Sequence, residues 1–179
     1  NEIIETERDY VNDLNTVVNN YLIPLRQQIN LGHMGISKKD GNTSIDEIFS
    51  NIESIQQTNS LLLSKLTEHM NKDSESDDEE DDEKGVEEMN ETKDTTSLVR
   101  TICHAFESVM EYFKMYSVYC VGYNRSIQCL SKFRSNQMLD RFLDRCSSTT
   151  TTNKTLSITT AGHIQLSSLL IKPIQRLCK

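Results

Sequence analysis

The sequence has no tryptophan, only two prolines and six glycines in 179 residues. It also lacks any apolar run near the roughly 20 residues that a membrane-spanning helix needs. Its first residues carry neither the basic nor the apolar region of a secretory leader. We therefore expect one soluble, cytoplasmic domain without a transmembrane segment.

Patterns typical of metal sites and of covalent catalysis are also missing. The five cysteines form no CxxC pair, and the four histidines form no HExxH or HxxxH pattern. Most of the cysteines fall where a helix would be apolar, so we expect buried reduced thiols, with a disulfide or metal framework as the alternative. No GxSxG motif and no Gly-rich phosphate loop occur. We expect no cofactor, no metal and no covalent chemistry.

Negative charge is concentrated in one segment. Residues 71–95 hold 13 Asp and Glu with three Lys, so the rest of the chain has a net charge of +2 although the total is −8. So few apolar residues and so many like charges predict a disordered acidic insertion. A calcium site or a tail for a basic partner are the alternatives, although no EF-hand spacing occurs. Because the remainder is not strongly basic, no nucleic-acid partner is expected.

Apolar residues three and four apart predict helices along most of the chain. Ile4, Val11, Val18 and Leu25 recur every seven residues and predict a first helix of about 25 residues that ends near Pro24. Residues 37–44 are polar and predict a loop. Next, Ser44 and Glu47 have capping-box spacing. The second helix is therefore predicted over about 45–70.

Similar patterns predict helices from 98 to 130 and from 136 to 146, with a Ser/Thr-rich surface loop at 147–155 between the latter and the last segment. In that last segment Pro173 either opens a helix or kinks it. Strand-like alternation is absent over any useful length. The prediction is an all-α fold, an elongated bundle of long helices with a disordered insertion at 71–95.

Three stretches have simple structural explanations as well as functional ones. The acidic residues at 2, 5, 7 and 9 are explained by a solvated helix face near a positive helix end. The tyrosines at 112, 116, 119 and 123 are interpreted as packing residues with hydrated hydroxyls rather than as ligands. In LLIKPIQR, apolar residues surround two cations, and Lys172 is either an amphipathic surface residue or part of a partner surface.

Four blocks, in order and across nearly the whole chain, resemble the Dbl homology (DH) domain of exchange factors for Rho-family GTPases. The first conserved region of that family resembles EIIETERDYVNDLNTVVNNYLIPL. Its later segments resemble IFSNIESIQQTNSLLLSKL, YFKMYSVYCVGYN and, for the third conserved region, LIKPIQRLCK. Residues 1–179 are thus identified as a DH (RhoGEF) domain. Family members continue with a K-Y-x-L-L-L helix, so the resemblance implies a domain incomplete at its C-terminal end.

The resemblance also implies a GTPase-binding surface. The opening glutamate matches Glu2, which would reach switch I, and Thr6 lies in the same motif. The lysine of the third region matches Lys172, which would contact switch II. After the proline, Ile174 would pack on the GTPase and help to select it, with isoleucine leaning toward Rac. Two more motif positions, Gln175 and Arg176, complete the set of six, and Arg176 serves structure as much as contact.

The function implied is acceleration of GDP release from a Rho/Rac-type GTPase, with recruitment to the plasma membrane through domains outside this chain. Two alternatives remain open at the level of sequence. One is a DH-like domain that binds GTPases or scaffolds without accelerating release. The other is an unrelated helical interaction bundle whose blocks match through amphipathic coincidence.

Overall fold

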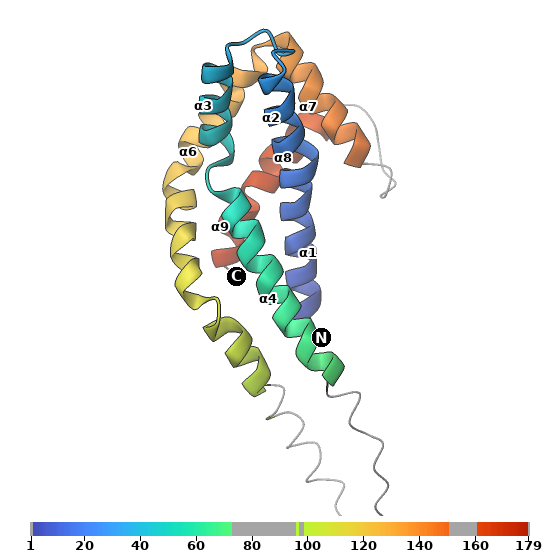
Figure 1. The fold of residues 1–179 in the computed structure, drawn as a ribbon, viewed down its shortest axis with the longest axis vertical. Coiled ribbons are helices and arrows are strands. Elements are labelled where there is room, and N and C mark those ends of the chain that lie inside the picture. Colours follow the sequence, from blue (N-terminus) through green and yellow to red (C-terminus); the bar gives the residue numbers. More distant parts are fainter. Residues whose placement is uncertain (1, 73–95, 97–98, 151–160, 179) are drawn as a thin grey trace, which may run out of the picture.

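The computed structural model describes residues 2–72, 96, 99–150 and 161–178. In chain order its elements are α1 (Glu2–Thr16), the π-helical segment η1 (Val17–Leu22), α2 (Ile23–Asn30), α3 (Lys38–Phe49), α4 (Ile52–Lys72), a helix over 99–107, the 3₁₀ segment η2 (Met110–Lys114), α6 (Met115–Arg134), α7 (Gln137–Thr150), α8 (Ala161–Leu170) and α9 (Lys172–Leu177). No strand occurs among these residues. The elongated helical bundle in Figure 1 confirms the predicted all-α fold.

The first helix continues past the predicted end near Pro24. α1, η1 and α2 follow one another without a break to Asn30. Proline has no backbone N–H and its ring crowds the carbonyl four residues back, which normally ends or kinks a helix. Here the turn just before Pro24 is π-helical, and the Ile23 N–H donates to the Val18 carbonyl five residues back. This wider turn accommodates the proline, so the helix proceeds.

The second helix, predicted over about 45–70, is in fact two helices, α3 and α4, and α3 begins earlier, at Lys38. Ser37, rather than Ser44, is the N-cap, and its hydroxyl accepts a hydrogen bond from the Asp40 N–H at 3.1 Å. Most of the predicted 37–44 loop therefore lies in α3. The helix stops at Ser50, which has a positive φ of 49°. The side-chain amide of Asn51 then donates to the Met115 carbonyl of α6 at 2.9 Å, which holds the break against a neighbouring helix.

The remaining boundaries correct two further predictions. The pattern over 98–130 is interrupted by η2 between the 99–107 helix and α6. α7 extends to Thr150, so the first four residues of the predicted Ser/Thr loop are helical; serine and threonine have only modestly lower helix propensity than alanine. Residues 151–155 of that loop, and 73–95 of the predicted acidic insertion, lie outside the described residues. At the other end, Pro173 opens α9, one of the two predicted roles.

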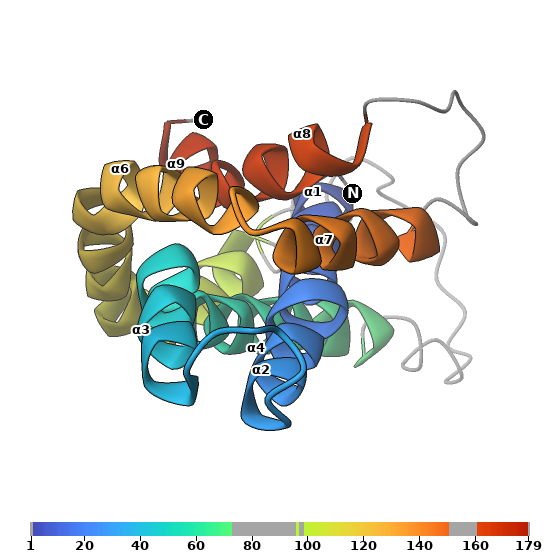
Figure 2. The same cartoon turned by 90° about the horizontal axis from the view of Figure 1, so that it is seen from above.

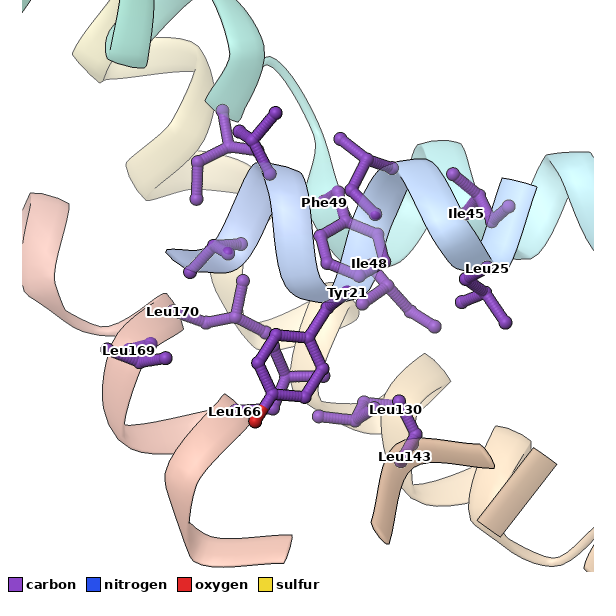
Figure 3. Close-up of a cluster of buried hydrophobic side chains, with 14 of the residues drawn as sticks. Tyr21, Leu25, Ile45, Ile48, Phe49, Leu130, Leu143, Leu166, Leu169 and Leu170 are labelled. Atoms are coloured by element: carbon purple, nitrogen blue, oxygen red, sulfur yellow. The ribbon is translucent and has the colours of Figure 1, made fainter. Parts of the chain in front are cut away.

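One large apolar cluster holds the upper part of the bundle together. Figure 3 shows side chains from α2, α3, α6, α7 and α8 converging around Tyr21 of η1. Seen from above in Figure 2, α1 lies between α8 and α9 on one side and α2, α3 and α4 on the other. A second buried cluster joins α1, α4 and the 99–107 helix; its members are Ile4, Leu62, Leu66, Ala105 and Val109. The first helix is thus packed on several sides along its length.

The cysteines follow the prediction only in part. All five are free, but only Cys146 is buried, and burial raises the pKa of its thiol to about 11. Cys103 and Cys178 are exposed; Cys103 lies on the unpacked side of the 99–107 helix, and Cys178 follows the end of α9. Among the described residues no group of three or more His, Cys, Asp or Glu is placed to hold a metal ion. None of the described helices has the length and apolar character needed to cross a bilayer.

Candidate functional site

The predicted residues at the N-terminal end of α1 lie on one exposed face. Glu2 opens the helix and Thr6 follows one turn later, and both are exposed. The Thr6 hydroxyl donates to the Glu2 carbonyl at 2.6 Å, so it is satisfied within the helix. The Glu2 carboxylate, by contrast, faces solvent near the positive end of the helix dipole. It is available to a partner that approaches this face.

The second group of predicted residues lies on α9. A single non-helical residue, Ile171, separates α9 from α8, and Pro173 is buried in the first turn of α9. Ile174 is half-buried against the main core, whereas Gln175 is exposed. The proline fixes the start of the helix, because its φ suits the first turn and its missing N–H would be unpaired there in any case. The first turn of α9 is therefore anchored to the core, and Ile174 and Gln175 follow directly after the anchored proline.

Arg176 turns inward and joins α9 to α1. Its guanidinium donates to Oε2 of Glu7 at 2.7 Å and lies over the Tyr10 ring, 5.7 Å from the centroid. Glu7 is only 1% exposed, and among the described residues its other oxygen, Oε1, has no hydrogen-bond partner. Burial raises the pKa of Glu7, and the bond and charge of Arg176 offset this only in part. The pair is a buried ion pair at the base of the surface.

The interpretation of residues 2, 5, 7 and 9 as a solvated face is wrong for Glu7. A signal for its burial was present in the sequence, since Glu7 stands three residues after Ile4 and four before Val11. Residues at that spacing share one helix face, and this face is the core stripe. An acidic residue within such a stripe indicates a buried partner, which here is Arg176.

Buried hydrogen bonds connect α4 and α6 to Tyr10, the ring that lies under the Arg176 guanidinium. The hydroxyls of Tyr10 and Tyr116 lie 3.0 Å apart, and the Asn59 side-chain amide donates to the Tyr116 hydroxyl at 2.8 Å. On α6 the Tyr119 hydroxyl donates to the Leu170 carbonyl at 2.7 Å. Tyr116 and Tyr119 therefore pack as predicted, but their hydroxyls bond to protein groups instead of water. Burial raises the pKa of both phenols, so they stay neutral.

Lys172 is held by a second acidic residue of α1. Its ammonium donates to a carboxylate oxygen of Asp13 in an ion pair whose side chains are 40% and 31% exposed, respectively. The pair lies at the solvent boundary, in contrast to the Glu7–Arg176 pair. The two ion pairs join α9 to α1 at positions six residues apart on α1. Residues from opposite ends of the sequence thus form one continuous surface.

Apolar side chains border this surface. Glu2, Thr6 and Arg176 line a hollow of about 430 Å³ whose walls include Ile3 and Leu177. Ile3 is 45% exposed and Leu177 is 52% exposed. Exposed apolar groups beside a few charged ones are the composition expected of a protein-binding surface.

Comparison with protein families matches the RhoGEF domain over residues 1–179. The chain belongs to the RhoGEF family. Among curated relatives of this RhoGEF domain, myosin-M heavy chain of Dictyostelium discoideum is 31% identical over 180 residues, covering 100% of this chain and 8% of that protein. The RhoGEF domain-containing protein gxcJ of the same organism is 30% identical over 178 residues, covering 99% of this chain and 11% of that protein.

A mammalian relative is Rho guanine nucleotide exchange factor 38 of Mus musculus, 27% identical over 179 residues and covering 99% of this chain and 19% of that protein. The chain thus spans less than a fifth of the length of each of these relatives. For the RhoGEF domain itself, the structure brings Glu2, Thr6, Lys172, Ile174 and Gln175 onto the α1–α9 surface, and it turns Arg176 toward the interior. Their roles toward a GTPase stay predictions.

Proposed function

We propose that this RhoGEF domain accelerates GDP release from a Rho/Rac-type small GTPase by binding its two switch regions through the α1–α9 surface. The observation that carries the proposal is the convergence of the two motif segments: Glu2 and Thr6 on α1, and Lys172 on α9, are joined by the Glu7–Arg176 ion pair. The family match over the whole chain supports the same conclusion. The activity is regulatory and involves no covalent chemistry.

The mechanism follows from linkage between two binding equilibria. A GTPase holds GDP through phosphate and Mg²⁺ contacts, and its switch segments order and disorder with the nucleotide. A surface that binds the nucleotide-free arrangement more tightly must weaken nucleotide binding by the same factor. On this proposal GDP leaves faster and GTP then enters the empty site.

Each exposed residue has a distinct part in this proposal. The carboxylate of Glu2, beside Thr6, accepts hydrogen bonds from switch I, while the Lys172 ammonium donates to switch II. The half-buried side chain of Ile174 packs on the GTPase and favours a Rac-type partner, and Gln175 adds a polar contact at its side. Arg176 donates to the buried Glu7 carboxylate, which favours a structural role for it rather than direct contact with the GTPase. In the cell, we propose a cytoplasmic protein that other domains bring to the plasma membrane.

The first test measures GDP release from Rho-family GTPases with a fluorescent nucleotide. Glu2→Ala and Lys172→Ala are each expected to slow release at least tenfold, about 1.4 kcal/mol of barrier, with little change in the free energy of unfolding. A control matched in charge to Glu2→Ala is Glu53→Gln, which breaks the α2–α4 ion pair with Arg26 away from the α1–α9 surface.

The outcomes separate the proposal from its alternatives. Release by the two variants at the wild-type rate contradicts the site assignment. Binding of the GTPase without faster release favours a non-catalytic binding or scaffolding domain. No binding to any member of the GTPase family tested contradicts the proposed function itself.

A further inference from the structure

We infer that Asp13 is a positioning residue that holds the Lys172 ammonium in the direction from which it contacts the GTPase. This inference rests on the proposed function, and it gives a role to a residue, Asp13, to which the resemblance assigns none. Among the described residues, the ion pair with Asp13 is the polar contact that the structure gives to Lys172. Lysine is a flexible side chain whose four-carbon stem otherwise samples many rotamers.

The geometry indicates that Asp13 orients the Lys172 ammonium without hiding it from a partner. An ammonium group has three N–H donors, and Asp13 receives one of them. Both side chains are partly exposed, at 40% for Lys172 and 31% for Asp13, so the remaining donors have access to an approaching acceptor. The ion pair also holds the charged end of Lys172 beside Asp13, where both side chains are partly exposed.

The position of Asp13 on α1 links the two halves of the surface. Asp13 is eleven residues after Glu2, which places it about 16 Å further along the helix and close to the same face. One rigid helix therefore carries the carboxylate that meets switch I and the carboxylate that orients Lys172. The buried Glu7–Arg176 pair lies between them along α1 and fixes the separation of α1 and α9. Preorganised side chains on rigid elements lose less conformational entropy when they bind.

The expected size of the effect is modest, because a partly exposed ion pair contributes little in isolation. Asp13→Asn keeps the shape of the side chain and removes its charge. We expect GDP release to slow by about threefold, which is within the range that a surface pair can supply. The matched control is again Glu53→Gln, because the Arg26–Glu53 pair has similar exposure, 38% and 41%, and joins α2 to α4. This variant is expected to leave release unchanged.

The decisive experiment is a double-mutant cycle on the GDP release rate. Because Asp13 acts through Lys172, Asp13→Asn is expected to slow release in the wild-type chain and to have no further effect in Lys172→Ala. An equal loss in both backgrounds means that Asp13 acts on α1 itself and overturns the inference. Unchanged or faster release in the single variant also overturns it, since faster release means that Asp13 restrains Lys172.

A second measurement needs no GTPase and separates this inference from the proposed function. The order of the Lys172 ammonium group, measured by nitrogen relaxation in the whole chain, is expected to fall in Asp13→Asn and to stay unchanged in Glu53→Gln. If the ammonium is equally ordered with and without the Asp13 charge, the positioning role is wrong even when the wild-type chain accelerates exchange. If the order falls but the wild-type chain accelerates nothing, the proposed function is wrong and the role of Asp13 in exchange is wrong with it.

Discussion

Replacing Arg176 by methionine tests the buried ion pair that joins α9 to α1. Arg176→Met keeps a long apolar stem but removes the guanidinium that donates to Glu7. The Glu7 carboxylate then stays buried, 1% exposed, without its cation. Removing one partner of a buried pair costs about 3–5 kcal/mol. Because the Arg176 side chain is 25% exposed and water can approach that side, we expect the lower end, about 3 kcal/mol.

The loss of stability caused by Arg176→Met depends on pH, and the direction in which the pKa of Glu7 is shifted determines whether the loss grows or shrinks as pH rises. Burial already raises this pKa in the wild-type chain, and losing Arg176 removes the interaction that lowers it. The folded variant therefore binds more protons than the unfolded chain from about pH 4.3, the ordinary pKa of glutamate, up to the raised pKa of Glu7 in the folded state. Under that condition the free energy of unfolding falls as pH rises. The loss caused by Arg176→Met is expected to be smaller near pH 5 than near pH 7.5.

Urea unfolding of the wild-type chain and Arg176→Met at both pH values measures this loss. A second variant, Glu7→Gln combined with Arg176→Met, removes the buried charge as well and is expected to recover much of the lost stability. The reasoning is refuted if Arg176→Met costs less than about 1 kcal/mol at neutral pH, the value of a surface pair. A loss that grows as the pH falls, or a double variant less stable than the single one, refutes it equally.

Two further predictions concern α3 and use unfolding free energies. Gly41→Ala places a Cβ about 2.5 Å from the Ile29 Cγ2 atom, so overpacking outweighs the gain in helix propensity and the protein is destabilised by about 1 kcal/mol. The control is Gly122→Ala in α6, where the nearest neighbour of the new Cβ is 3.8 Å away and the substitution is expected to stabilise the protein. Ser37→Ala removes the N-cap of α3 and is expected to cost about 1 kcal/mol, while Ser44→Ala inside α3 changes little. Equal effects within either pair would contradict the assigned packing or capping.

The sequence predicts helices wherever a side-chain stripe is long and regular, as in α1, because helical periodicity is a local property. Prediction from the sequence fails at helix boundaries that are determined by contacts with other parts of the fold. Pro24 is tolerated because the preceding turn widens to a π-helix. Ser37 caps α3 although Ser44, which has a glutamate three residues later, has the preferred capping-box residues. α3 ends at Ser50, which has a positive φ, and the neighbouring Asn51 side chain donates a hydrogen bond to α6.

The site divides in the same way. The exposed Glu2 and the partly exposed Lys172 are predicted by the family motifs, because their positions in those motifs are distinctive. The buried support is not, since a motif does not say which way a side chain turns. Arg176 matches a binding motif yet lies against Tyr10 and Glu7. A charged residue in a core stripe was the local signal for this arrangement, and its partner lies 169 residues away in the sequence.

The central claim is tested most directly by assembling the chain with a Rho-family GTPase in the absence of nucleotide and then adding GDP or GTP. We expect a stable complex with the nucleotide-free GTPase that dissociates when either nucleotide is added, because the domain and the nucleotide weaken each other's binding by the same factor. A complex equally stable with and without nucleotide, or no complex with any member of the family tested, would mean that the domain does not displace nucleotide by binding the empty GTPase.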